Sequence, residues 1–177
     1  MDTQAFIKRF FLLLLFTVLQ VFVFGRIALF GYATPLVYIW MILRLDSSVS
    51  KYATLLWAFF LGLAIDIFSA TPGLNAAAAT LTGLLRPVIL SASVRLDKHD
   101  ILTPCSRTMG KGTFAAYLSI LTLIHSLVYF LLRNIPFAGW SVLLADVLGS
   151  TLLTFLIIYC IDVSFPGKSE RRYTSNL

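Results

Sequence analysis

The sequence predicts an all-α membrane protein, folded as a six-helix transmembrane bundle in a single integral membrane domain that covers residues 1–177. Of the 177 residues, 59% are hydrophobic and 12% are charged, and the mean hydropathy is +0.89. A soluble domain is typically about 45–50% apolar and about 25% charged. The composition therefore excludes a soluble globular enzyme, and it also excludes a disordered chain, which requires low hydrophobicity. At about 20 residues per membrane helix, this length allows about six spans joined by short loops.

The first two apolar runs cover residues 10–24 and 27–45. The first follows Lys8 and Arg9, as in a signal peptide, but no small-x-small cleavage site comes after it, so we expect an uncleaved span. The second contains Thr34 and Pro35, a pair typical of an N-cap and the first turn of a helix. Two interpretations stay open for this segment: a short helix that starts at Pro35, or a re-entrant piece that does not cross fully.

Four further spans are predicted at residues 52–68, 74–94, 114–132 and 141–161. The tight turn at residues 69–73 joins the first two of these. The stretch 95–113 is the one long polar connection, and we expect a solvated basic loop there. A short polar tail follows the last span.

The basic residues predict the orientation of the bundle, because cytoplasmic loops are enriched in lysine and arginine. With both termini in the cytoplasm, eleven of the 14 basic residues lie on that side, two lie outside, and one lies within a span. The outer pair is Arg26 and Arg133, and the residue within a span is Arg86. The net charge of +6 therefore reflects topology or attraction to the lipid bilayer, and nucleic acid is excluded as a partner. Because Cys105 and Cys160 fall near the cytoplasmic side, no structural disulfide is expected.

Four ionisable or polar residues lie inside predicted spans: Asp66, Arg86, His125 and Asp146. An ionisable group in hydrocarbon costs at least about 2.5–3.5 kcal/mol, so each one calls for a partner or a function. One interpretation joins them in a proton or ion relay. The alternative, which we favour, is that Asp66 reaches the interface, that Arg86 pairs with Asp146 or with carbonyls freed by Pro87, and that His125 is a hydrogen-bonded interior residue.

The turn after the third span suggests another role for Asp66, which is to cap that turn. Pro72 and Gly73 predict a tight corner, and Asn75 is placed to cap the helix that follows. Small residues then form a thin helix face that allows close approach of another helix, namely Ala76, Ala77, Ala78, Ala79 and Gly83. This face either packs within the bundle or docks the single span of a partner.

Residues for catalysis are missing from the sequence. We find no paired carboxylates at glycosidase spacing, no Ser-His-Asp set on one side of the membrane and no glycine-rich phosphate loop. No cluster of metal ligands accompanies His125. The sequence therefore predicts a protein with no enzymatic activity, no metal and no cofactor.

The middle of the chain resembles the MreD family of rod shape-determining proteins. The resemblance is carried by Phe60–Phe68, Thr71–Ala78 and Leu84–Pro87, about the central quarter of the chain. In that family a glycine and an aspartate close one helix, a Pro-Gly turn follows, and a helix of small residues comes next. The matching positions are Gly62, Asp66, Pro72, Gly73 and Arg86, and Thr34-Pro35-Leu36 is similar to the family's early proline.

The resemblance implies a non-enzymatic, multi-pass subunit of the bacterial inner membrane that binds the bitopic protein MreC. Through MreC it implies a place in the elongation machinery, with actin-like MreB filaments, a SEDS glycosyltransferase and a class B penicillin-binding protein. It also implies a fold like the six-helix S-components of energy-coupling-factor vitamin transporters. A vitamin-binding S-component or a small solute carrier is therefore the competing function, for which Asp66, Asn75, Tyr129 and Asp146 could line an outer pocket. The sequence leaves open the oligomeric state, a homodimer included, and the face that meets MreC.

Overall fold

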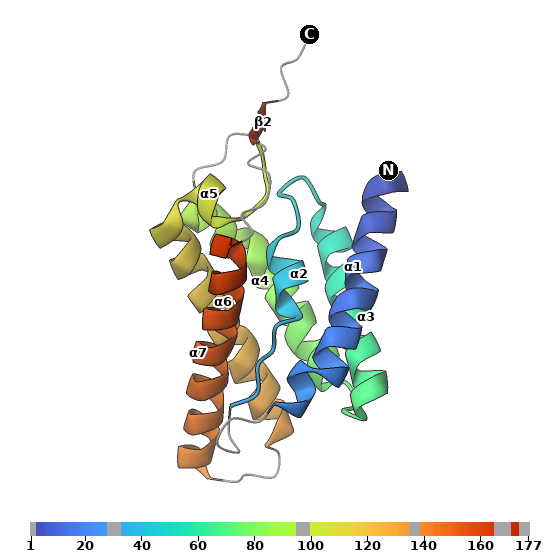
Figure 1. Ribbon diagram of the computed structural model, residues 1–177, viewed down its shortest axis with the longest axis vertical. Coiled ribbons are helices and arrows are strands. Elements are labelled where there is room, and N and C mark those ends of the chain that lie inside the picture. The colour runs from blue at the N-terminus through green and yellow to red at the C-terminus, as the bar shows by residue number, and fades with distance from the viewer. Residues whose placement is uncertain (1–2, 28–32, 95–99, 135–138, 165–170, 174–177) are drawn as a thin grey trace.

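The computed structural model describes residues 3–27, 33–94, 100–134, 139–164 and 171–173. Within these residues, five helices are long and apolar enough to cross a membrane, so the chain is a multi-pass membrane protein. They are α1 (Thr3–Phe22), α3 (Lys51–Ser69), α4 (Leu74–Ser93), α6 (Lys111–Arg133) and α7 (Trp140–Ser164). A short 3₁₀ helix, η1 (Phe24–Arg26), extends α1. The five helices stand side by side, and α1 begins at the end of the bundle where α7 ends (Figure 1).

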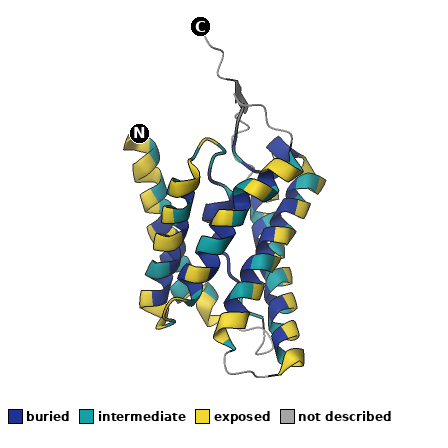
Figure 2. Ribbon diagram, turned by 180° about the vertical axis from the view of Figure 1, so that it is seen from behind, coloured by how far each residue is buried: buried dark blue, intermediate teal, exposed yellow. Residues whose placement is uncertain are grey.

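The surface of the bundle is apolar along the helices, as contact with lipid requires. Figure 2 shows exposed residues on the outward faces and buried residues between the helices. On α7, Leu144, Leu148, Leu152 and Leu156 recur every four residues and are 48–61% exposed. A soluble protein rarely exposes so continuous an apolar face. The composition is thus explained by side chains that face a bilayer.

The second predicted span differs most from expectation. The described part of residues 27–45 holds one helix, α2 (Ile39–Leu43), after an irregular stretch at 33–38. This helix is short, as one of the two interpretations expected, but it begins at Ile39 and not at Pro35. Pro35 disfavours helix because it lacks an N–H and restricts Thr34. The segment nevertheless runs inside the bundle from one end toward the other (Figure 1). An extended chain advances about 3.3 Å per residue against about 1.5 Å in a helix, so it needs fewer residues to cover the same depth.

Side chains of α1 and α7 satisfy the backbone of this segment. The amide of Thr34 donates a hydrogen bond to Ser150 Oγ, and the amide of Leu36 donates one to Thr154 Oγ1, each at 2.9 Å. From α1, Gln20 Nε2 donates to the carbonyl of Pro35 at 2.9 Å, and Gln20 Oε1 accepts from the Tyr38 amide at 3.4 Å. Non-helical backbone is tolerated at membrane depth only where protein supplies such partners.

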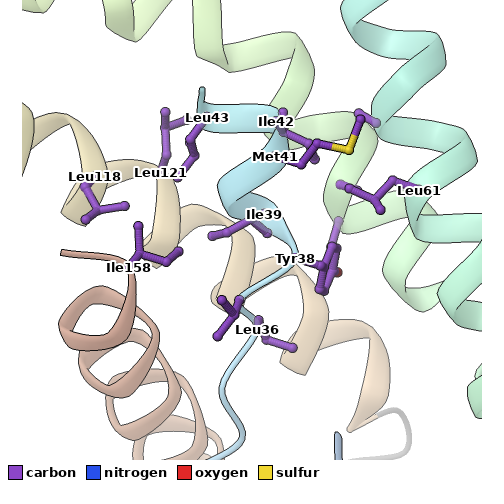
Figure 3. Close-up of a cluster of buried hydrophobic side chains, with 14 of the residues drawn as sticks. Leu36, Tyr38, Ile39, Met41, Ile42, Leu43, Leu61, Leu118, Leu121 and Ile158 are labelled. Carbon is purple, nitrogen blue, oxygen red and sulfur yellow. The ribbon is translucent and has the colours of Figure 1, made fainter. Parts of the chain in front are cut away.

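Around this segment lies the hydrophobic core. Figure 3 shows side chains of the segment and of α2 pointing toward Leu61 of α3, Leu118 and Leu121 of α6, and Ile158 of α7. From Leu36 to Leu43, every residue except Trp40 is at most 3% exposed. The second segment is therefore enclosed by the other helices and provides the centre of the bundle.

At the end of the bundle where α1 begins, the connection before α6 contains secondary structure and buried residues. Strand β1 (Asp100–Leu102) pairs antiparallel with β2 (Arg171–Tyr173), and the short helix α5 (Ser106–Met109) follows β1. Asp162 of α7 is fully buried. Its Oδ2 accepts a hydrogen bond from the Ser106 amide at 2.8 Å, and its Oδ1 forms an ion pair with Arg44 at 3.4 Å. The expectation of a solvated loop at 95–113 is thus wrong for Leu102, Cys105, Ser106 and Met109, which are buried. Residues 95–99 lie outside the described part.

Candidate functional site

The carboxylate of Asp66 organises the turn between α3 and α4. Its Oδ1 accepts hydrogen bonds from Thr71 Oγ1 at 2.9 Å, from the Asn75 amide at 3.0 Å and from Asn75 Nδ2 at 2.9 Å. Its Oδ2 accepts from the Ala76 amide at 2.8 Å. A carboxylate placed at the first turn of a helix satisfies amides that have no partner within the helix, and it complements the helix dipole.

Among the interpretations of Asp66, the structure shows the capping role. The residue is only 4% exposed, because its carboxylate faces the turn and the first residues of α4. Asn75 does not cap α4 as expected, because it lies inside the helix and its own amide is one of those that Asp66 caps. The backbone of the turn fits this arrangement, since Ala70 and Gly73 both adopt left-handed conformations, with φ of 53° and 78°.

Small residues allow α3 and α4 to approach closely. A Cβ placed on Gly62 would lie 2.5 Å from both Ala76 Cα and the Asn75 carbonyl oxygen. A Cβ on Gly83 would lie 3.0 Å from Ala58 Cβ. Ala76, Ala79 and Gly83, predicted as a packing or docking face, are buried, and two of these positions pack directly on α3. The structure therefore uses this face within the bundle.

Beside this contact lies an apolar groove on the surface of α3 and α4. Its volume is about 480 Å³, and its lining includes Phe59, Ala77, Thr80 and Leu84. Ala77 and Leu84 are exposed on the side of α4 that faces away from the bundle. Where a thin helix surface meets lipid, another membrane helix can approach closely.

A chain of buried hydrogen bonds continues inward from Asp66. Asn75 Oδ1 accepts from the Tyr38 hydroxyl at 2.9 Å, the same hydroxyl lies 2.8 Å from His125 Nε2, and His125 Nδ1 lies 2.9 Å from Thr82 Oγ1. Tyr38 and His125 are both 0% exposed. The chain thus ties the second segment to α3, α4 and α6.

The side-chain amide of Asn75 determines which groups donate and which accept in this chain of hydrogen bonds. Because its Nδ2 donates to Asp66 and Thr71, its Oδ1 faces Tyr38 and can only accept. The single proton of the Tyr38 hydroxyl therefore goes to Asn75, and His125 Nε2 donates to Tyr38. No acidic side chain bonds to His125, and an unpaired buried charge is costly, which favours the neutral ring. The Thr82 hydroxyl then has two acceptors within reach, the Ala78 carbonyl at 2.8 Å and His125 Nδ1 at 2.9 Å. His125 is thus a hydrogen-bonded interior residue, as expected.

Replacing Tyr38 by phenylalanine is expected to lower the free energy of unfolding by about 1 kcal/mol, since it removes a donor from Asn75 and an acceptor from His125. Thermal unfolding in detergent would measure the change. Tyr52→Phe is the matched control, because Tyr52 is 81% exposed. Equal stability of the two variants would contradict the hydrogen-bonded chain.

Arg86 binds the end of α2. Its Nε donates to the Leu43 carbonyl at 3.4 Å and its Nη2 donates to the Leu45 carbonyl, while the Tyr117 hydroxyl also donates to Leu43 at 3.1 Å. A cation is favourable at a helix C-terminus, where carbonyls lack partners. The prediction that Arg86 pairs with carbonyls is right in kind. The carbonyls are those of Leu43, the last residue of α2, and of Leu45 just after it, and not those of the turn before Pro87, which lies within α4.

Asp146 lies apart from this site. Its Oδ2 accepts from Asn134 Nδ2 at 3.4 Å, and the pairing with Arg86 considered from the sequence is not found among the described residues. The structure therefore brings Asp66, Asn75 and His125 into one network and leaves Arg86 and Asp146 outside it. Among the described residues, no three His, Cys, Asp or Glu side chains lie close enough together to hold a metal ion.

Sequence reasoning missed several residues on which the interior depends: Gln20, Tyr38, Ser150, Thr154 and Asp162. A signal for three of them was available. Ser150, Thr154 and Asp162 share the buried face of α7 with Leu143, Val147 and Ile158, at intervals of three and four residues. Polar residues on the inner face of an apolar helix indicate a polar group opposite. For Ser150 and Thr154 this group is the backbone of the second segment, and for Asp162 it is the Ser106 amide and the Arg44 side chain.

Comparisons with known proteins identify no relative of this chain. No family model, no curated protein and no solved structure matches the chain.

Proposed function

We propose that this chain is a non-enzymatic membrane scaffold subunit of the bacterial cell-wall elongation complex, similar to MreD, that binds the single span of MreC. The observation that carries the proposal is the Asp66 turn with the α3–α4 contact behind it. Three positions of the resemblance in this region have a structural reason: Gly62 for the contact, Asp66 for the cap, and Gly73 for the corner. Through MreC the chain would act with MreB, the SEDS glycosyltransferase and the class B penicillin-binding protein.

The surface that best suits the partner's span is the groove on α3 and α4. Gly83 and the backbone of Ala76 pack on α3, and Ala79 is buried, so the partner would meet α4 along the groove at Ala77, Thr80 and Leu84. Lipid gives two helices no hydrophobic reason to associate, so recognition rests on close packing and a few hydrogen bonds. A groove with a small residue and a threonine hydroxyl fits that requirement. Both termini would lie in the cytoplasm of the producing bacterium.

Site-specific photo-crosslinking in cells tests this proposal. A photoreactive residue at Ala77, Thr80 or Leu84 is expected to capture MreC. The matched controls are Leu148 and Leu152, which are 60% and 61% exposed on α7. Products only from the α7 positions would place the partner elsewhere, and no MreC product from any position would contradict the proposal. Depletion of the chain is expected to convert rods to round cells, and unchanged shape would also contradict it.

The competing function, a substrate-binding S-component or a small solute carrier, requires a polar cavity between the outer ends of the helices. Asp66 and Asn75, two of the four groups expected to line it, bond instead to each other and to the turn. Neither residue lines the groove on α3 and α4. The gene neighbourhood distinguishes the functions, because genes for MreC and a penicillin-binding protein favour the scaffold and a transporter ATPase favours the carrier.

A further inference from the structure

A second cavity lies between the first turns of α1 and the end of α2, and it is lined by cations. Its volume is about 480 Å³, within the range of about 300–1,000 Å³ common for small-molecule sites. From α1 it receives Lys8, Arg9 and Leu12, which recur at helical spacing on one face. From the other side come Trp40 and Arg44.

The charges in this cleft do not cancel. Asp46 is the one acidic residue among those that line it, against Lys8, Arg9 and Arg44. Arg9 and Asp46 approach only to 3.8 Å, and Asp46 is 42% exposed, so their pairing is loose. Even with Asp162, which pairs with Arg44 from outside the cleft, one positive charge remains in excess.

The cleft also combines a polar and an apolar side. The guanidinium of Arg44 lies over the ring of Trp40, 4.9 Å from its centroid. Trp40 Nε1 is buried and has no hydrogen-bond partner among the described residues. The exposed face of α1 beyond the cleft is apolar, with Phe11 and Leu15 at 64% and 40% exposure.

We infer that this cleft binds the phosphate headgroup of an anionic phospholipid, with its acyl chains along α1. Charge complementarity selects an anion, since Lys8, Arg9 and Arg44 can surround a phosphate and arginine matches its oxygens in a bidentate way. The apolar surface of α1 selects an amphiphile over a free anion. The position suits a headgroup, because the cleft lies where α1 begins, at one end of the apolar bundle (Figure 1). The idea does not depend on the proposed function.

The test uses the full chain in nanodiscs of phosphatidylglycerol or phosphatidylcholine, with thermal unfolding and native mass spectrometry as readouts. Phosphatidylglycerol is expected to raise the melting temperature and to remain bound on transfer to the gas phase. The K8Q/R9Q variant is expected to retain it about tenfold more weakly. The matched control K51Q/K111Q removes two exposed cations from the same end of the bundle and is expected to behave like the parent.

Three results would overturn the inference. Equal loss in both double variants would show general surface attraction and no site. Equal stabilisation by inorganic phosphate in detergent would show that the cleft binds the free ion. No difference between the two lipids would show that the cleft does not select an anionic phospholipid. If K8Q/R9Q does not fold, K8E serves in its place, because Lys8 is exposed and makes no ion pair within the described chain.

Discussion

Gly62→Ala is expected to lower the free energy of unfolding by about 3 kcal/mol or more, the upper part of the range for an overfilled core. The added Cβ would lie 2.5 Å from Ala76 Cα and from the Asn75 carbonyl oxygen, and backbone atoms within a helix cannot move aside alone. The two helices would have to separate, which would also draw Asp66 away from the amides that it caps. Unfolding in detergent, together with gel filtration, would measure the loss.

The control for this substitution is Gly112→Ala in α6, because a Cβ there meets nothing within 4 Å. Gly83→Ala is expected to be intermediate, since its Cβ would meet the Ala58 methyl at 3.0 Å. If Gly62→Ala unfolds at the same temperature as Gly112→Ala, the close contact of α3 and α4 is not what holds this pair together.

Asp66→Ala is expected to cost about 2–4 kcal/mol. The substitution leaves two backbone amides, one hydroxyl and one side-chain amide without the acceptor they now share. Buried donors without a partner cost about 1–3 kcal/mol each, but water at the end of the helix can replace part of the loss. Asp66→Asn keeps one acceptor oxygen and is expected to recover part of the stability. Thermal unfolding of the three proteins in the same detergent measures the series.

Asp146→Ala is the matched control for the carboxylate, because Asp146 makes one hydrogen bond of 3.4 Å. An equal loss from Asp66→Ala and Asp146→Ala would contradict the capping role. The comparison also separates capping from the general cost of changing the charge of the chain, which is identical in the two variants.

The long helices could be predicted from the sequence, and so could the Asp66 turn. Each depends on local information: apolar runs of sufficient length, the corner at Pro72 and Gly73, and a carboxylate a few residues before the next helix. The partner of Arg86 could not be predicted, because Leu43 and Leu45 are some forty residues away in the chain. Sequence distance hides such contacts even when the need for a partner is clear.

The second segment shows why hydropathy alone was insufficient. Residues 27–45 are as apolar as a membrane helix, but the path of the chain depends on Gln20, Ser150 and Thr154, whose side chains replace helical hydrogen bonds. Likewise, Tyr38 is an ordinary aromatic residue in the sequence and becomes the link between Asn75 and His125 only in the folded bundle. In both cases the hydrogen bond that a polar atom makes depends on a residue far away in the sequence.

The irregular backbone at residues 33–38 has a consequence for how the protein is made. Thr34 and Leu36 depend on Ser150 and Thr154, separated from them by 116 and 118 residues. A growing chain therefore delivers the second segment to the membrane long before α7 exists to receive its amides. Backbone amides without hydrogen-bond partners are not tolerated in lipid. Until α7 is made, the segment therefore has to remain in the translocation machinery, in water or in another conformation. Biogenesis of this bundle is thus completed by its last helix, and a ribosome that stops before α7 leaves a product without a finished interior.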